Sequence, residues 1–241
     1  APALGRRPDT VAAARAEWGA AVGGGCGAAG RGGGVEVAAG RVLAPGAADN
    51  REEHPVEKVT IVAPTTLDPI TALIVVDLQA GLAGAPFVHP FADVVARARA
   101  LLNAFRRRGL PVVLVNVDGV APGRTERPRH NSAFPDGWTD LLPELDRQPG
   151  DIVVTKRTWG AFASTDLEMQ LKARGVTHVV VAGVATGTGV ESTARQAFEA
   201  GLNVTLAIDA MTDARPNAHD YRIEQVFPLS LIHISEPTRP Y

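Results

Sequence analysis

The sequence predicts a three-layer α/β/α sandwich around a mainly parallel, Rossmann-like sheet. Two observations support this fold class. Short apolar runs rich in β-branched residues recur along the chain, and segments with helical periodicity separate them. A βαβ order of this kind implies right-handed crossovers, which place helices on both faces of one sheet.

The apolar runs have the pattern of parallel strands that are buried on both faces, because their hydrophobic residues are continuous rather than alternating. Polar or charged residues follow most of these runs, as expected where a chain returns to water. We expect strands at Leu73–Val76, Val112–Val115, Ile152–Val154, Val179–Val181 and Val204–Ile208.

The segments between these runs predict helices. Apolar residues from Phe91 to Phe105 share one helix face, and so do those from Val190 to Phe198. The motif Thr165-x-x-Glu168 predicts a capping box that opens a further helix. Each helix is expected to end at a glycine, namely Gly109, Gly175 and Gly201.

Composition divides the chain into three segments. Residues 1–50 contain 15 Ala and 12 Gly, so we expect residues 1–56 to be a disordered or spurious tail. Residues 229–241 read LSLIHISEPTRPY, which looks like one reading frame of a transposase sequencing adaptor. We interpret them as a scar and exclude them from the predicted fold. The remaining residues, 57–228, have the length of one domain.

Charge and cysteine content exclude several classes of function. Lys and Arg number 24 against 26 Asp and Glu, so no basic excess favours nucleic acid or a membrane surface as a partner. No run of 18 apolar residues predicts a spanning helix. Cys26 is the single cysteine, which excludes internal disulfides and cysteine-rich zinc sites. A reducing cytoplasm is the expected location.

The ends of the predicted strands bring chemistry-bearing residues to one edge of the sheet, where open α/β folds bind ligands. Asp77 stands in the apolar stretch LIVVDLQ. A carboxylate buried there requires a partner or a raised pKa, and Lys156 is the nearest expected partner. The set at this edge comprises Asp77, Asp118, Lys156, the Gly183–Gly189 loop and Asp209.

The Gly183–Ala194 loop joins a strand to a helix and predicts an anion or oxyanion site. Gly189 occupies the turn position where a nucleophile is often placed, and it has no side chain. The nearby hydroxyls have no adjoining histidine, so a Ser/His triad is not expected. Histidines without metal-ligand spacing are interpreted as surface or loop residues, namely His89, His130 and His219.

Three motifs together resemble the isochorismatase-like hydrolases, also called cysteine hydrolases. They are VVDLQ around Asp77, TKRTWGAF around Lys156, and AGVATGTGVESTARQAFEAG around Gly189, and the resemblance spans about residues 61–227. In that family an aspartate, a lysine and a cysteine form the catalytic set. The first two map to Asp77 and Lys156, and the cysteine position is Gly189.

This departure decides the chemistry that the resemblance implies. Without a thiol, amide hydrolysis through a thioester lacks its nucleophile. True isochorismatases resemble this chain in carrying glycine there, which implies hydrolysis of an enol ether. Asp77 would protonate the vinyl carbon, water would add, and pyruvate would leave. Lys156 would orient Asp77 and hold substrate charge, so desolvation must outweigh its lowering of the Asp77 pKa.

Supporting roles follow from the same resemblance and from position. Gln79 is expected to hydrogen-bond the loop that carries Asp77, and Trp159 and Phe162 to form apolar pocket walls. The family's cis peptide maps to Val184–Ala185. The expected substrate-binding set is Gln79, Trp159, Phe162, Ala185 and Thr186.

The resemblance also implies a small-molecule substrate, no cofactor, no metal and a homo-oligomer. Arginines of the polar loop after Asp118 could bind a substrate carboxylate, although we favour a solvated loop there. These arginines are Arg124, Arg127 and Arg129.

Two further interpretations stay open. One is a catalytically silent relative that only binds small molecules. The other, which is weaker, is dinucleotide binding, suggested by Gly187-x-Gly189-x-x-Ser192 with Asp209 twenty residues beyond Gly189.

Overall fold

The computed structural model describes residues 67–126, 134–229 and 232–234. The expected tail at residues 1–56 lies outside the described residues, as do Arg127, Arg129 and His130.

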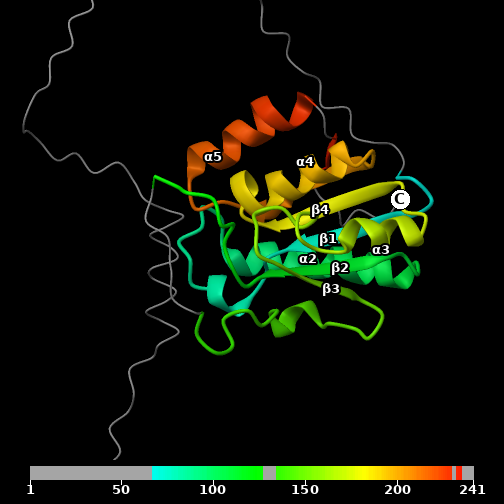
Figure 1. The fold of residues 1–241 in the computed structure, drawn as a ribbon, viewed down its shortest axis with the longest axis horizontal. Helices are drawn as coiled ribbons and strands as arrows, with labels where there is room; N and C mark the ends of the chain where they lie inside the picture. The colour runs from blue at the N-terminus through cyan, green and yellow to red at the C-terminus, as the bar shows by residue number, and fades with distance from the viewer. Residues whose placement is uncertain (1–66, 127–133, 230–231, 235–241) are drawn as a thin grey trace, which may run out of the picture. The chain divides into compact units, whose positions relative to one another are not determined.

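Within the described residues, the strands form one parallel sheet with the order β3-β2-β1-β4-β5-β6 (Figure 1). The predicted fold class is therefore confirmed. All five predicted strands are present, and each is longer than its apolar run. The strands are β1 Thr71–Val76, β2 Val112–Val117, β3 Ile152–Lys156, β4 His178–Val184, β5 Asn203–Thr212 and β6 Ile232–Ile234.

Strand β6 lies within the segment that we excluded from the predicted fold. Its backbone pairs in parallel with β5, so that Ile232 lies opposite Thr205. Residues 232–234 thus take a position beside β5, whereas the origin of residues 229–241 stays a prediction.

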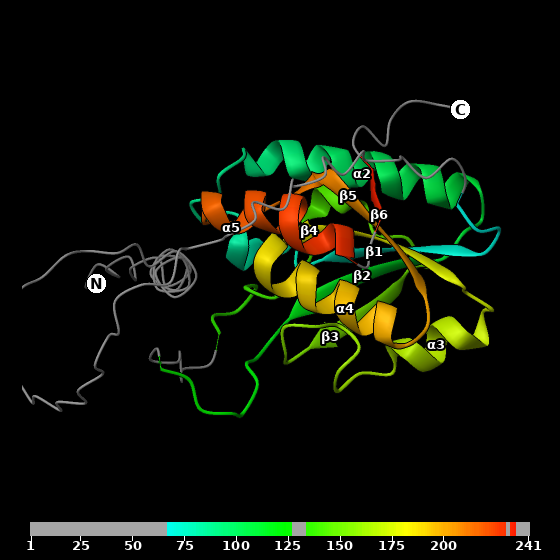
Figure 2. The ribbon, with the colours of Figure 1, turned by 90° about the horizontal axis from the view of Figure 1, so that it is seen from above.

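Helices cover both faces of the sheet. Figure 2 shows α2 along one face and α3 and α4 along the other. The helices are α2 Phe91–Arg107, α3 Leu167–Ala173, α4 Glu191–Glu199 and α5 Pro216–Tyr221. Short turns are η1 Ala80–Leu82, η2 Pro143–Leu145, η3 Thr186–Val190, η4 Arg222–Val226 and η5 Phe227–Leu229.

The apolar run of β1 is continuous because the strand is buried on both faces. Leu73 and Val75 belong to the core that packs under α2, whereas Ile74 and Val76 belong to the core under α3 and α4. All four side chains are at most 1% exposed. Because both faces of β1 are buried, its residues from Ala72 to Val76 are all apolar, and the next polar residue is Asp77.

The glycines predicted to end the helices are confirmed, but the predicted start of α3 is not. The backbone φ angles of Gly109, Gly175 and Gly201 are 66°, 67° and 84°, as expected of glycines that end helices. The predicted capping box of α3 is wrong. The helix begins at Leu167, and Glu168 pairs with Lys172 instead of reaching back.

Strand β5 continues past the predicted end at Ile208. Its register with β4 shifts between the pairs Val181↔Leu206 and Gly183↔Met211. Asp209 lies in this irregular part and accepts a hydrogen bond of 2.8 Å from Arg97 of α2. The expectation that Asp209 follows the end of the strand is therefore wrong, and Asp213 occupies that position.

Candidate active site

The order of the sheet reverses between β1 and β4, because β2 and β3 lie on one side of β1 and β5 lies beyond β4. The carboxyl ends of strands at such a switch point form the usual ligand crevice of an open α/β sheet. Asp77 directly follows β1, and the turn η3 follows β4. The fold therefore places two of the three recognised motifs at this point.

Lys156 reaches Asp77 from the end of β3. Its Nζ donates a hydrogen bond of 2.7 Å to Asp77 Oδ2 and one of 3.2 Å to the carbonyl of Thr158. The Lys156 side chain is 2% exposed and that of Asp77 is 8% exposed. The predicted pairing of the two groups is thus confirmed, and both side chains are almost completely shielded from solvent.

Burial raises the pKa of Asp77 to about 6, although Lys156 pulls it down by charge and hydrogen bonding. This is the balance that an acid role requires, because desolvation outweighs the ammonium group. Among the described residues, Asp77 Oδ1 has no hydrogen-bond partner. The carboxyl group can therefore hold a proton near neutral pH on Oδ1, the oxygen that Lys156 does not contact.

The backbone of Asp77 is also unusual. Its φ angle is 54°, in the left-handed region that residues other than glycine rarely adopt. The Asp77 N–H donates to the carbonyl of Val115, and its own carbonyl accepts from Gln79 N–H. These bonds hold a strained conformation at the end of β1, as is common at functional sites.

Gly189 faces the Asp77 carboxyl from the turn η3. A Cβ atom at position 189 would lie 3.1 Å from Asp77 Oδ2 and 3.0 Å from the carbonyl oxygen of Val184. Any side chain at this position would therefore contact Asp77. The structure brings all three recognised residues, Asp77, Lys156 and Gly189, to one place.

Two backbone features carry the chain from β4 into this turn. Gly183 has a φ of 108°, and a Cβ there would lie 2.1 Å from the carbonyl oxygen of Val76. Only glycine permits this close approach to β1. The Val184–Ala185 peptide bond is cis, as the resemblance implied.

Helix α4 links the turn to the loop that follows Lys156. Thr193 Oγ1 donates a hydrogen bond of 2.7 Å to the carbonyl of Gly189 and accepts one of 3.1 Å from Ala161 N–H. Gln196 Oε1 accepts a hydrogen bond of 3.1 Å from Phe162 N–H. Thr193 and Gln196 are not among the residues predicted from the sequence, because a polar residue within a helix does not indicate which loop it contacts.

Gln79 is held by hydrogen bonds to backbone groups. The side chain is fully buried. Its Nε2 donates to the carbonyls of Val117 and Trp138, and its Oε1 accepts from Val117 N–H at 2.8 Å. These partners belong to β2 and to the segment around Trp138, so the expected hydrogen bond to the loop that carries Asp77 is wrong. The assignment of Gln79 to substrate binding stays a prediction.

The other expected substrate-binding residues differ in exposure and in the contacts that they make. Trp159 is 66% exposed, so it encloses no pocket in this structure, and Phe162 packs against the core under α3 and α4. Thr186 is fully buried, and its Oγ1 lies 2.9 Å from His219 Nδ1 in a hydrogen bond. The carbonyl of Ala185 accepts hydrogen bonds from within the turn. None of these contacts tests whether the residues bind substrate.

The histidines interpreted as surface or loop residues differ in outcome, because His89 is exposed in the loop before α2 as expected, whereas His219 lies against the turn. His219 is 5% exposed and contacts the ring of His89 edge-on, with ring centroids 4.8 Å apart. His89 Nδ1 in turn pairs with Thr212 Oγ1 at 3.1 Å. The interpretation of His219 is therefore wrong, because α5 folds back over η3, which local sequence pattern cannot predict.

Two charged groups at the predicted edge form peripheral ion pairs. Asp118 accepts a hydrogen bond of 3.0 Å from Arg157, which is largely exposed. Asp209 pairs with Arg97 on the α2 face, so it is not placed to bind a ribose beside Gly187 and Gly189.

In the part of the chain that the structure describes, no group of three His, Cys, Asp or Glu residues is arranged for a metal, and no helix is long and apolar enough to cross a membrane.

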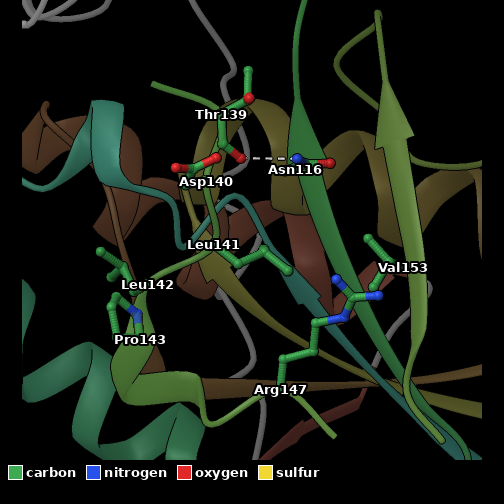
Figure 3. Close-up of a pocket in the computed structure, with 8 residues that line it drawn as sticks. All are labelled: Asn116, Thr139, Asp140, Leu141, Leu142, Pro143, Arg147 and Val153. Carbon is green, nitrogen blue, oxygen red and sulfur yellow. Dashed lines mark hydrogen bonds between the residues drawn. The ribbon is translucent and has the colours of Figure 1, made fainter. Parts of the chain in front are cut away.

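A cleft of about 300 Å³ lies beside the segment that joins Thr139 to Pro143 (Figure 3). Asn116 donates a hydrogen bond of 2.8 Å to the carbonyl of Thr139 at one end, and Arg147 lies at the other (Figure 3). Asp77, Lys156 and Gly189 are not among its lining residues. The cleft is therefore separate from the candidate catalytic group.

Comparison with known proteins identifies a family. Residues 71–235 match the family model described as the isochorismatase domain. An uncharacterized isochorismatase family protein of Escherichia coli O157:H7, YecD, is 40% identical over 167 residues, which cover 66% of this chain and 88% of the relative.

Two further comparisons bear on fold and activity. A solved isochorismatase family protein from Burkholderia thailandensis superposes with a TM-score of 0.68 and 40% identity, covering 70% of this chain and 93% of the other. The ureidoacrylate amidohydrolase RutB of Stutzerimonas stutzeri is 34% identical over 191 residues, covering 65% of this chain and 77% of the relative.

Proposed function

This chain belongs to the isochorismatase family and is a hydrolase, and we propose that its substrate is a small molecule with an enol ether of the isochorismate type. One observation carries the proposal. The position that faces the Asp77 carboxyl is Gly189, which has no side chain and therefore no nucleophile. Chemistry that needs only a proton donor and water suits this arrangement.

The proposed reaction starts at Asp77. With a pKa of about 6, its carboxyl group retains a proton in a useful fraction of molecules near neutral pH. It transfers this proton to the vinyl CH₂ carbon of the substrate, which leaves positive charge on the ether carbon and oxygen. Water adds to that carbon, and the resulting hemiketal collapses to pyruvate and the ring alcohol.

Lys156 supports both halves of this reaction. Its ammonium group orients the Asp77 carboxyl through Oδ2, which leaves Oδ1 for proton transfer. Once Asp77 has given up its proton, the same ammonium group stabilises the carboxylate. It also supplies positive charge for an acidic substrate. No cofactor enters this proposal, in which the protein is a cytoplasmic homo-oligomer.

Amide hydrolysis is the chemistry that the name of the ureidoacrylate relative suggests. It would require a nucleophile at the turn, and Gly189 has no side chain to provide one. A protein that binds small molecules without turnover is the other alternative. The retained pair of Asp77 and Lys156 speaks for catalysis, because a buried ion pair is seldom favourable for stability alone.

The proposal is tested with purified protein and two substrates, isochorismate and ureidoacrylate. Lactate dehydrogenase reports pyruvate from the first, and an ammonia assay reports hydrolysis of the second. We expect pyruvate release by the wild type and its loss in Asp77→Asn. Ammonia release would support the amidase alternative, and binding without either product would support the silent one.

A further inference from the structure

The connection from β5 to α5 lies against the first residues of the turn that carries Gly189. Strands β4 and β5 pair Val184 with Thr212 at their carboxyl ends. The residues after Thr212 therefore lie beside the residues after Val184. This places a carboxylate, Asp213, and a histidine, His219, next to η3, although neither takes part in the proposed reaction.

Asp213 is completely buried, and its carboxylate is fully engaged. Oδ2 accepts a hydrogen bond of 2.8 Å from Gly187 N–H. Oδ1 accepts bonds of 3.1 Å from Arg215 N–H and 3.3 Å from Arg215 Nε. A buried carboxylate needs such partners, and one of them is a backbone group of the turn itself.

His219 holds the neighbouring residue. Its Nδ1 hydrogen-bonds the hydroxyl of Thr186 at 2.9 Å, and both side chains are buried. Burial lowers the pKa of His219, and His89 lowers it further, whereas Asp220 and Asp213 oppose the shift. The ring therefore stays neutral near pH 7, which keeps this contact a hydrogen bond between uncharged groups.

Position 187 itself is closely surrounded. A Cβ at Gly187 would lie 3.2 Å from Asp213 Oδ2 and 3.4 Å from Arg222 Nε. Arg222 is tied to Glu191, the first residue of α4, by a hydrogen bond of 2.9 Å. The turn is thus held from outside at two successive residues, Thr186 and Gly187, two residues before Gly189.

We propose that Asp213 and His219 are positioning residues, which fix Thr186 and Gly187 and thereby keep the backbone of Gly189 against the Asp77 carboxyl. Loss of either contact should loosen the turn, and neither Asp213 nor His219 belongs to the expected substrate-binding set. The turnover number should then fall more than substrate affinity. This proposal rests on the proposed function for its kinetic readout only.

The test uses two variants of the full chain, each with a matched control. Thr186→Val removes the hydroxyl that meets His219, whereas Thr186→Ser keeps it. Asp213→Asn removes the negative charge beside Gly187. Asp209→Asn makes the same change in an aspartate of β5 that faces α2.

Hydrogen–deuterium exchange of residues 186–190 is measured first, without substrate. We expect at least tenfold faster exchange there in Thr186→Val and Asp213→Asn, with the core strands unchanged, and wild-type exchange in both controls. In the pyruvate assay, kcat should fall at least tenfold in the two variants, with KM within threefold of the wild type, and Thr186→Ser should restore it.

Wild-type exchange of the turn in either Thr186→Val or Asp213→Asn would overturn the proposal. So would an equal rise of exchange across the whole domain, since that reports general destabilisation. If the wild type releases no pyruvate, the proposed function fails, and the exchange measurement still decides the positioning role.

Discussion

Asp77 and Lys156 form an ion pair of 2.7 Å between two side chains that are both less than 10% exposed. The carboxyl still has a pKa raised to about 6, because burial outweighs the charge of its partner. One oxygen of Asp77 meets the lysine, and the other has no hydrogen-bond partner among the described residues. This asymmetry supports the proposal that Asp77 donates a proton to the substrate.

The raised pKa predicts how stability depends on pH. Between the ordinary value of 3.8 and about 6, the folded state holds the Asp77 proton more tightly than the unfolded state does. The contribution of Asp77 to the free energy of unfolding should therefore fall by about 3 kcal/mol in total as pH rises from well below 4 to well above 6, and most of this fall should occur between pH 4 and 6.

Urea unfolding of the wild type and of Asp77→Asn at a series of pH values measures this contribution as a difference. The subtraction is needed because Asp68, whose pKa is lowered by hydrogen bonds from Thr177 and Asn203, gives the opposite slope. A difference that does not change between pH 4 and 6 would contradict the raised pKa.

Replacement of Lys156 should shift the acid. Because the lysine lowers the Asp77 pKa by charge and hydrogen bonding, Lys156→Met should raise that pKa above 6. The alkaline decline of kcat/KM should then move to higher pH. Carbon-13 NMR titration of the Asp77 carboxyl gives the pKa directly. Arg157→Met is the control, since Arg157 pairs with Asp118, and it should leave the titration as in the wild type.

A thiol at position 189 should change the reaction. Contacts of 3.0–3.1 Å around a Cβ there mean that Val184, Val76 and Asp77 must shift slightly, so Gly189→Cys should lose about 1–3 kcal/mol of stability. Pyruvate release should fall, and an amide substrate should form a thioester visible by mass spectrometry. Gly189→Ala is the steric control and should lose pyruvate release without forming an adduct.

Gln79 and Trp159 should behave in opposite ways in stability measurements. Gln79→Leu removes the Gln79 partner of the buried Val117 N–H and carbonyl and one of the hydrogen bonds to the Trp138 carbonyl, so we expect a loss of about 2–4 kcal/mol. Trp159→Ala removes an exposed side chain and should change stability by less than about 0.5 kcal/mol. Chemical denaturation of both variants checks this, and equal losses would contradict the assignment.

The sequence was sufficient for strands β1 to β5 and for the pairing of Asp77 with Lys156. Continuous apolar runs require burial on both faces, and in a parallel sheet the strand ends meet at one edge, which predicted that Asp77 and Lys156 approach each other. The position of Gly189 followed from its motif in the strand-to-helix loop.

Other features depend on contacts that local pattern does not encode. Asp209 interrupts an apolar stretch, which suggested the end of a strand. Strand β5 instead continues past Asp209 with a shift in its register to β4, and Asp209 accepts a hydrogen bond from Arg97. Asp213 and His219 reach the turn from 26 and 33 residues away. Trp159 lies in a recognised motif and is nonetheless exposed, because burial depends on which element covers a loop.

The central claim is that Asp77 protonates an enol ether whose ether carbon is then attacked by water. The most direct test is turnover of isochorismate in doubly labelled water, D₂¹⁸O, with pyruvate trapped at once as lactate and both products analysed by mass spectrometry. We predict one deuterium in the lactate methyl group, ¹⁸O on its second carbon, and no ¹⁸O in the ring diol, with no product from Asp77→Asn. Oxygen-18 in the ring diol, or unchanged turnover by Asp77→Asn, would contradict the account.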